Sequence, residues 1–363
     1  MSQEARSGPA YARPMQYRQL GSSGLRVSTI TLGTMGFGGT GWASPIGNLD
    51  VDGARRQIDL AREAGVNLID TADVYSNGLS EEILGEALGK NRDDVLIATK
   101  VRGGMGDGPN DAGLSRHHII EGAEASLRRL KTDHIDLYQV HEWDGQTPLE
   151  ETMKALDDLV RSGKVRYIGA SNYTGWQLMK ALWTADKHHT EKFVSQQIYY
   201  SLQARDAENE LVPVSIDQGL GILVWSPIAG GLLSGKYRRG QDAPEGTRRF
   251  EGWTEPPVHD EDRLYDTIDA LVEIGEGHGV SAARVALAYT LAKPAVTSLI
   301  VGARTEEQLA DNLAAADLEL SADELARLDA VSLEPLRYPH WHQLNAADRL
   351  GESTKALLTP HLG

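Results

Sequence analysis

The sequence predicts an α/β fold, a closed (β/α)8 TIM barrel built from one domain. Short apolar runs rich in β-branched residues alternate with amphipathic helical patterns along the chain, and this alternation is typical of parallel βαβ units. The candidate strands number eight, which is the number that closes such a barrel. An open, doubly wound sheet is the alternative fold.

Domain boundaries follow from the same pattern in the 363 residues, because no shift in composition marks a second domain. We place the barrel at residues 16–335. A disordered N-terminal tail (1–15) precedes it, and a C-terminal tail (336–363) follows it.

The first expected element is a β-hairpin, because Gly21-Ser22-Ser23-Gly24 separates two short extended runs. The eight expected strands are Thr29–Leu32, Asn67–Asp70, Val95–Thr99, Ile135–Val140, Val165–Ala170, Phe193–Gln197, Gly221–Trp225 and Val296–Ile300. The helical patterns lie at Val51–Ala64, Glu81–Leu88, Arg116–Leu130, Leu149–Arg161, Trp176–His188, Asp206–Gln218, Asp262–Gly277 and Ala282–Leu291.

Three loops are long for this fold: Gly33–Asp50, Arg102–Ser115 and Ala229–Asp260. They follow the first, third and seventh strands. In a barrel the loops after the strands line the mouth of the active site, so the loops after the third and seventh strands, which are rich in Gly or Pro, are candidate substrate lids.

The amino-acid composition and net charge bear on which classes of molecule this protein could bind. Lys plus Arg total 36 against 52 Asp plus Glu, a net charge of −16, which disfavours nucleic acid and anionic membranes because both carry phosphate. With no cysteine, disulfides, thiolate nucleophiles and Cys-based metal sites are excluded. The N-terminus has no apolar run of a signal peptide, and no stretch of ~18 apolar residues predicts a membrane span. A cytoplasmic protein without a metal site is expected.

Four polar residues stand at or just after apolar runs. Asp70, Lys100 and His141 each follow the apolar residues of a strand, and Tyr75 lies in the loop after Asp70. In a barrel these strand ends are neighbours on one rim, so the side chains should converge. Each residue alone also has a structural interpretation, such as a turn cap, a loop aromatic, a solvated strand end or a buried structural histidine.

One type of reaction would use all four of these residues together. A tyrosine with an ordinary pKa near ~10 is a poor acid at neutral pH, and we expect the Lys100 ammonium to lower the pKa of Tyr75. Asp70 would keep the lysine charged, and a neutral His141 would orient a carbonyl oxygen. Together these groups make a general acid for a carbonyl that receives a hydride. The hydride must come from a cofactor, because no side chain supplies one.

The motifs that carry these residues resemble the aldo-keto reductase family, including its branch of channel β subunits. They are Gly65–Tyr75 with Ser80–Gly85, Ser126–Leu130 with Asp136–His141, Gly163–Asn172, and Trp225–Pro227 with Gly235–Tyr237. The likeness runs from about Tyr17 to about Asp329. It implies an NADP(H)-dependent reductase of aldehydes or ketones, a small-molecule carbonyl substrate, and Tyr75 as proton donor with Asp70, Lys100 and His141 as its partners.

The resemblance also implies a set of cofactor contacts near the strand ends. Amide and hydroxyl groups would hold the nicotinamide, Trp225 would stack on it, and glycines would let the backbone approach the pyrophosphate. The implied residues are Gly33, Thr34, Met35, Ser171, Asn172, Gln197, Trp225, Ser226, Ile228, Gly230, Leu232, Gly302, Arg304, Gln308 and Asn312.

The segment after the last strand bears on the choice between NADP and NAD. Arg304 is the cation that the resemblance implies for the 2′-phosphate, at the start of a helix whose Thr305 and Gln308 are spaced as a capping box. Some family members have lysine and serine in place of Gly302 and Ala303, and arginine in place of Gln308. We expect NADP(H) as the cofactor.

Two other functions remain open on the sequence. A barrel of this family can bind NADP and act as a regulatory or interaction subunit with little turnover. A barrel sugar hydrolase or isomerase is the third candidate. The substrate and the oligomeric state cannot be deduced from the sequence.

Overall fold

The computed structural model of the chain describes residues 15–40 and 46–361. The expected disordered tail at residues 1–15 lies outside the described residues except for Met15, and so do residues 41–45 of the first long loop. Everything below refers to the described part.

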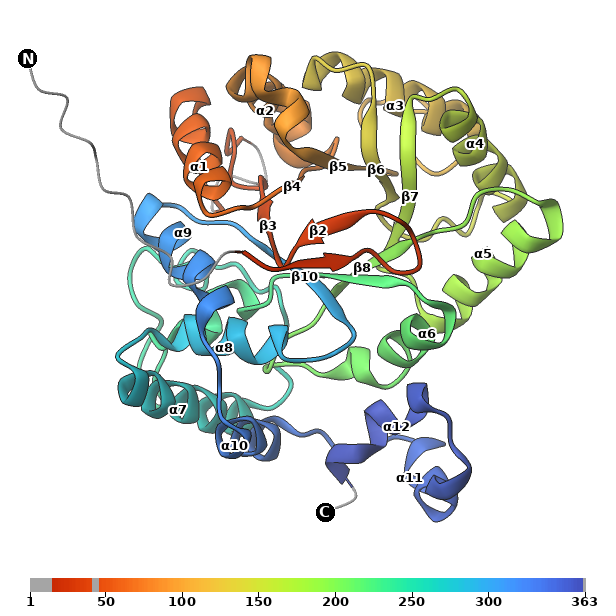
Figure 1. Cartoon of the computed structure of the whole chain (residues 1–363). Helices are drawn as coiled ribbons and strands as arrows, with labels where there is room; N and C mark the ends of the chain where they lie inside the picture. Colours follow the sequence, from red (N-terminus) through yellow and green to blue (C-terminus); the bar gives the residue numbers. More distant parts are fainter. Residues whose placement is uncertain (1–14, 41–45, 362–363) are drawn as a thin grey trace, which may run out of the picture.

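Eight parallel strands close into a barrel in the order β10-β3-β4-β5-β6-β7-β8-β9, with helices packed around the outside (Figure 1). This confirms the predicted TIM barrel and rules out the open sheet. The strands are β3 (Ile30–Gly33), β4 (Leu68–Asp70), β5 (Leu96–Val101), β6 (Ile135–Val140), β7 (Val165–Ser171), β8 (Ser195–Tyr199), β9 (Gly221–Trp225) and β10 (Val296–Val301).

The helices around the barrel pack apolar side chains against the strands. Every residue of β6 is buried, as expected for a parallel strand whose two faces are both covered. The α-helices are α1 (Val51–Glu63), α2 (Leu79–Leu88), α3 (Arg116–Leu130), α4 (Leu149–Arg161), α5 (Gly175–His188), α6 (Leu211–Gln218), α7 (Glu261–His278), α8 (Ala282–Leu291), α9 (Glu306–Leu313), α10 (Ala322–Ser332), α11 (His340–Gln343) and α12 (Glu352–Leu358).

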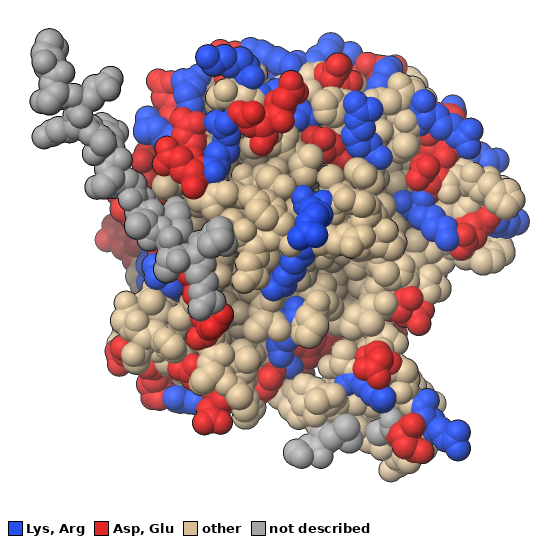
Figure 2. Space-filling view, viewed as in Figure 1, with Lys and Arg blue, Asp and Glu red and all other residues tan. Residues whose placement is uncertain are grey.

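The expected hairpin covers the floor of the barrel. Strands β1 (Tyr17–Gln19) and β2 (Arg26–Ser28) pair antiparallel, and the hairpin contributes Leu20 to an apolar cluster beneath the strands. Gly21 has a φ of +59°, and a Cβ there would lie 2.4 Å from the Val194 carbonyl oxygen, so only glycine fits this close approach. Figure 2 shows this face, with acidic and basic side chains intermixed around its rim.

The C-terminal segment differs from the expectation of a plain tail. It contains the short helix α11 and then α12, which packs against α6 and lies below the barrel in Figure 1. Leu357 and Leu358 of α12 are buried. Among the described helices, none has the length and apolar character needed to cross a membrane.

Candidate active site

A buried ion pair forms the centre of the site. Lys100 Nζ lies 2.6 Å from Asp70 Oδ1 and 2.7 Å from the Thr71 carbonyl oxygen, and it donates a hydrogen bond of 3.2 Å to the Tyr75 hydroxyl. The side chains of Lys100 and Asp70 are almost fully buried. The three acceptors use the three protons of the ammonium. The position of the ammonium is therefore fixed, and the Tyr75 hydroxyl is the acceptor in its bond with Lys100.

The second oxygen of Asp70 is held by two amides from the barrel interior. Gln197 Nε2 donates to Asp70 Oδ2 at 2.8 Å, and Gln139 Nε2 donates to it at 3.2 Å. Sequence reasoning assigned Gln197 to the cofactor and missed Gln139. Gln139 is a buried residue of β6 and lies directly opposite Lys100 in the pairing of β5 with β6.

Tyr75 is placed by an unusual turn. It begins a short 3-10 segment in which Ser76 and Asn77 have φ values of 49° and 55°, a conformation that costs free energy for residues other than glycine. Ser76 Oγ compensates by donating to the Phe37 carbonyl oxygen at 3.1 Å. The turn brings the Tyr75 ring edge-on to His141, with ring centroids 6.0 Å apart.

His141 is neutral at physiological pH. Burial, and then the positive charges of Lys100 and Arg102, lower the pKa of His141 to about 3. The backbone N–H of His141 donates to the Val101 carbonyl oxygen at 2.9 Å, which ties the end of β6 to β5. A neutral imidazole can donate a hydrogen bond to a carbonyl oxygen without adding charge.

The expectation that Lys100 lowers the pKa of Tyr75 below its ordinary value is wrong. Burial raises the pKa of Tyr75 more than the Lys100 ammonium lowers it, with Asp70 adding a smaller increase, so the pKa lies above its ordinary value. Burial also opposes the charge on Lys100, but Asp70 and Tyr75 outweigh it and raise the pKa of Lys100. Lys100 therefore limits the rise in the pKa of Tyr75 and does not bring it below 10.

Asp73 is a second buried acid near this centre that sequence reasoning did not single out. Its side chain is fully buried, and no side chain of the described residues hydrogen-bonds its carboxyl. The nearby guanidinium of Arg129 donates instead to Glu81, at 2.7 Å. Burial, and then the Glu81 carboxylate, raise the pKa of Asp73 to about 8, so Asp73 carries a proton at neutral pH.

A pocket of about 600 Å³ opens at the carboxyl ends of the strands. Three members of the predicted tetrad, Asp70, Tyr75 and His141, line it, while Lys100 lies behind them. Of the implied cofactor contacts, the pocket is lined by Gly33, Thr34, Met35, Ser171, Asn172, Gln197, Trp225, Ser226, Ile228, Gly230, Gly302, Arg304, Gln308 and Asn312. Leu232 is not one of the lining residues, since it packs in an apolar cluster with Leu264 and Ile268.

The end of this pocket near His141 has polar groups suited to bind a carboxamide. Ser171 is buried, and its Oγ has no hydrogen-bond partner among the described residues. Asn172 has a φ of +55°, and its amide donates to the His141 carbonyl oxygen at 3.1 Å and accepts from Trp225 Nε1 at 3.0 Å. The unpartnered hydroxyl, the amide and the indole fit a nicotinamide ring.

The other end of the pocket is locally basic in a chain of net charge −16. Arg304 lines it and donates to the Gly246 carbonyl oxygen at 2.7 Å. Sequence reasoning missed Lys236 and Arg248, which also line this pocket. Burial, and then the charge of Arg304, lower the pKa of Arg248, so the two guanidinium groups lie close together. Such a cluster of cations fits the phosphates of a dinucleotide.

The segment that follows β10 confirms the expected helix start. Thr305 caps α9 by accepting from the Gln308 backbone N–H at 3.2 Å. The Gln308 side chain accepts from the Arg304 backbone N–H at 3.1 Å, one residue earlier than in a standard capping box. Gln308 therefore has a structural role as well as a place in the pocket wall.

The model of the aldo/keto reductase family matches residues 29–333. The chain belongs to the aldo/keto reductase family. This family of oxidoreductases was expected from the motifs around Asp70, Tyr75 and His141. No group of His, Asp and Glu side chains that could hold a metal ion occurs in the described part of this family member.

Three relatives illustrate the range of the family. The chain is 40% identical over 328 residues to the uncharacterised oxidoreductase YrpG of Bacillus subtilis, covering 87% of this chain and 96% of the relative. It is 36% identical over 343 residues to the versiconal hemiacetal acetate reductase of Aspergillus parasiticus, with coverage of 87% and 96%. It is 37% identical over 311 residues to a probable voltage-gated potassium channel subunit β of Arabidopsis thaliana, with coverage of 84% and 92%.

Proposed function

We propose that this aldo-keto reductase uses NADP(H) to reduce an aldehyde or ketone to an alcohol, with Tyr75 as the proton donor. The observation that carries the proposal is the Tyr75 hydroxyl, which accepts a hydrogen bond from buried Lys100 and faces a pocket shared with His141. No other described tyrosine has an ammonium at this distance from its hydroxyl and a place in the same pocket wall as a neutral histidine.

The roles of the side chains follow from their charges and contacts. When bound, the reduced nicotinamide supplies the hydride for the carbonyl carbon. Tyr75 gives its proton to the carbonyl oxygen as negative charge develops there. His141, neutral at the working pH, donates a hydrogen bond to the same oxygen and orients it. Lys100 stabilises the phenolate that remains, and Asp70 keeps Lys100 in place.

The chain offers separate groups for the two ends of the cofactor. Ser171, Asn172 and Trp225 would hold and stack the nicotinamide. Arg304 and Arg248 would hold the 2′-phosphate, which is the reason to propose NADP(H) over NAD(H). Charged hydrogen bonds of this type contribute about 1.5–3 kcal/mol each.

Substitution of Tyr75 by phenylalanine tests the proposal. Tyr75→Phe should lower the rate of carbonyl reduction by ~10²–10⁴, the usual scale for a general acid, while NADPH affinity changes by less than about threefold. The measurements are NADPH oxidation with a panel of aldehydes and ketones, and cofactor titration by fluorescence. Reduction by Tyr75→Phe at the wild-type rate would remove Tyr75 from the role.

A regulatory subunit is the second candidate function, because one relative carries the name of a potassium channel β subunit. Both candidates bind NADP(H), so cofactor affinity does not separate them. Turnover does: a reductase oxidises NADPH catalytically with at least one carbonyl class. A subunit would bind NADPH tightly and show no turnover above the rate of Tyr75→Phe.

A further inference from the structure

One segment of the loop after β9 forms part of the pocket wall, and we call it the strap (residues 246–257). Arg248 and Trp253 of the strap line the pocket. The strap is tied near both ends. Arg304 Nη1 donates to the Gly246 carbonyl oxygen at 2.7 Å, and Gln203 Nε2 donates to the Pro257 carbonyl oxygen at 3.0 Å. The second tie comes from the turn that follows β8.

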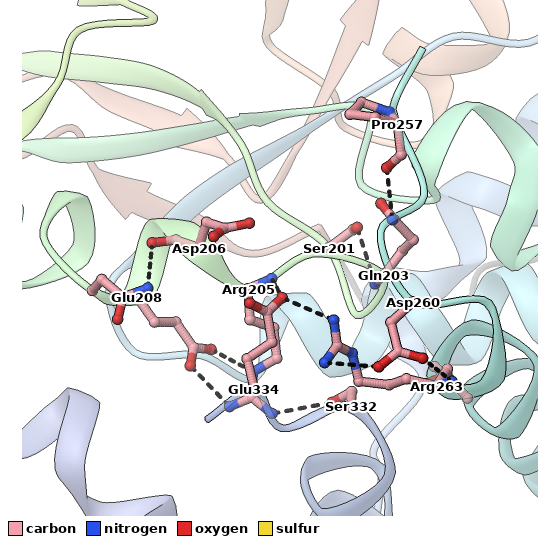
Figure 3. A network of polar contacts seen from close by, with 12 residues as sticks. Ser201, Gln203, Arg205, Asp206, Glu208, Pro257, Asp260, Arg263, Ser332 and Glu334 are labelled. Atoms are coloured by element: carbon pink, nitrogen blue, oxygen red, sulfur yellow. Dashed lines mark hydrogen bonds and ion pairs between the residues drawn. The ribbon is translucent and has the colours of Figure 1, made fainter. Parts of the chain in front are cut away.

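Gln203 uses both ends of its amide. It is buried, and its Oε1 accepts a hydrogen bond of 2.5 Å from the Tyr199 hydroxyl, while its Nε2 reaches Pro257. Its backbone N–H donates to Ser201 Oγ at 3.2 Å, which fixes the turn. Figure 3 shows Gln203 between Ser201 and Pro257. Because the amide is buried, losing either partner leaves a polar group unsatisfied.

Tyr199 continues the connection toward the end of the pocket near His141. Tyr199 and Trp225 are paired residues of β8 and β9, and their ring centroids lie 5.0 Å apart with an interplanar angle of 36°. Burial raises the pKa of Tyr199 far above its ordinary value, so the hydroxyl keeps its proton and stays the donor to Gln203. Trp225 in turn donates to Asn172, whose amide donates to the His141 carbonyl oxygen.

We propose that Gln203 is a positioning residue that couples the strap to Trp225 and thereby links cofactor retention to the geometry of the catalytic centre. Opening the strap breaks the bond to Pro257, and rotation of the amide toward a new acceptor would take Oε1 away from Tyr199. The closed strap and the stacked position of Trp225 are therefore stabilised together. The assignment of a role in retention rests on the proposed function.

Two substitutions probe the two ends of the amide. Gln203→Met keeps the length of the side chain and removes both hydrogen bonds. Tyr199→Phe keeps the ring on Trp225 and removes only the hydroxyl, which hydrogen-bonds to Gln203 Oε1 and to Ser201 Oγ, both outside the strap. Arg337→Ala is the matched control, because Arg337 forms an exposed ion pair with Asp206 just beyond the same turn.

Two readouts are used on the full chain. The first is the rate of NADPH release, measured by stopped-flow fluorescence. The second is the rate of trypsin cleavage after Arg248 and Arg249 in the strap, measured without cofactor. We expect each single variant to raise both rates by about fivefold, the effect of one ordinary hydrogen bond. The double variant Gln203→Met with Tyr199→Phe should show the same two rates as Gln203→Met alone. Arg337→Ala should show the rates of the wild type.

The effect of Tyr199→Phe decides the proposal. If it leaves both rates at the wild-type value while Gln203→Met raises them, Gln203 only anchors the strap and the coupling is overturned. Independent, multiplicative effects in the double variant would also overturn it. If wild-type protein does not bind NADPH, the proposed function fails, and strap cleavage in the cofactor-free protein still decides whether the coupling exists.

Discussion

At the scale of single residues, the chemistry depends on how Lys100 and burial divide their influence on Tyr75. Burial raises the pKa of the phenol, and Lys100 is the main group that opposes the rise. The net effect keeps Tyr75 protonated, as a proton donor must be, while the phenolate formed after donation lies beside an ammonium. The same pair thus serves both directions of a reversible reduction.

Replacement of Lys100 should therefore act mainly on alcohol oxidation, which needs the phenolate. In Lys100→Met burial is unopposed, so the pKa of Tyr75 rises further and less phenolate exists at neutral pH. Oxidation should fall, and the rising limb of its pH profile should move to higher pH. The check is alcohol oxidation against pH for both proteins. Profiles that coincide, with only a lower melting temperature in the variant, would make Lys100 a structural residue.

Asp73 predicts a pH dependence of stability. Its pKa is about 8 in the fold and near ~3.9 in the unfolded chain. Between these values the folded protein holds a proton that the unfolded chain has lost, so the contribution of Asp73 to stability decreases as pH rises from about 4 to about 8 and is constant above.

Asp73→Asn should remove that decrease. Relative to wild type, the variant should gain on the order of a few kcal/mol in free energy of unfolding between pH 4.5 and pH 8.5. Urea unfolding at several pH values measures the difference. Glu82→Gln, an exposed change on the neighbouring helix, is the control. A difference between Asp73→Asn and wild type that does not vary with pH would show that Asp73 is ionised in the fold.

The sequence was a good guide to these residues where strand ends determine their position. Asp70, Lys100 and His141 follow apolar runs, and the barrel brings such positions to one rim. Gln139, Asp73 and Arg248 were missed because their roles depend on contacts between segments: a strand register, a burial that leaves a carboxyl without a side-chain partner, and a loop folded over the pocket. Local pattern carries no information on these contacts.

At the scale of elements, most strand and helix positions were predicted within two residues, and the exceptions have local causes. The expected helix Asp206–Gln218 is divided into a 3-10 turn at Asp206–Glu208 and α6 from Leu211. A continuous helix would place Pro213 in its interior, where proline lacks the N–H and its ring clashes with the preceding turn. Helix α10 was not among the predicted helices, although Ser321 and Glu324 form a capping box at its start.

The tie between Arg304 and the strap (residues 246–257) leads to a testable prediction. Arg304→Ala removes a pocket cation and also one tie of the strap. NADPH affinity should fall by about one to two powers of ten, the equivalent of ~1.5–3 kcal/mol, with little change for NADH. Arg249→Ala is the matched control, since Arg249 ties the strap by donating to the Pro256 carbonyl oxygen and does not line the pocket.

Titration of NADPH and NADH against Arg304→Ala and Arg249→Ala separates the loss of the Arg304 charge from the loss of a tie of the strap. The control variant should weaken NADPH and NADH by the same small factor. Equal losses for the two cofactors in Arg304→Ala as well would mean that Arg304 acts only through the strap, and the 2′-phosphate would then lie elsewhere.

At the scale of the whole molecule, Arg205 joins parts of the chain that are distant in sequence. It is almost fully buried, and its guanidinium pairs with Glu208 at 2.9 Å and with Asp329 of α10 at 3.0 Å. It also donates to Ser332 Oγ at 3.0 Å, and its backbone N–H donates to Glu334 at 3.2 Å. These contacts, several of them drawn in Figure 3, fasten the C-terminal part of the chain to the turn after β8.

Loss of this guanidinium should be costly because it leaves the partly buried Glu208 carboxylate without its cation, while Asp329 keeps only its ion pair with Lys293. Breaking such a pair typically costs about 3–5 kcal/mol, whereas an exposed pair contributes about 0–1 kcal/mol. Arg205→Met, which keeps most of the side-chain volume, should therefore lower the free energy of unfolding far more than Arg337→Ala. The two arginines reach the same turn, so the comparison isolates burial. Urea unfolding at pH 7 measures both. If the two variants lose equal stability, the buried network adds no more than a surface ion pair, and the C-terminal segment must be held by the apolar packing of α12 on α6.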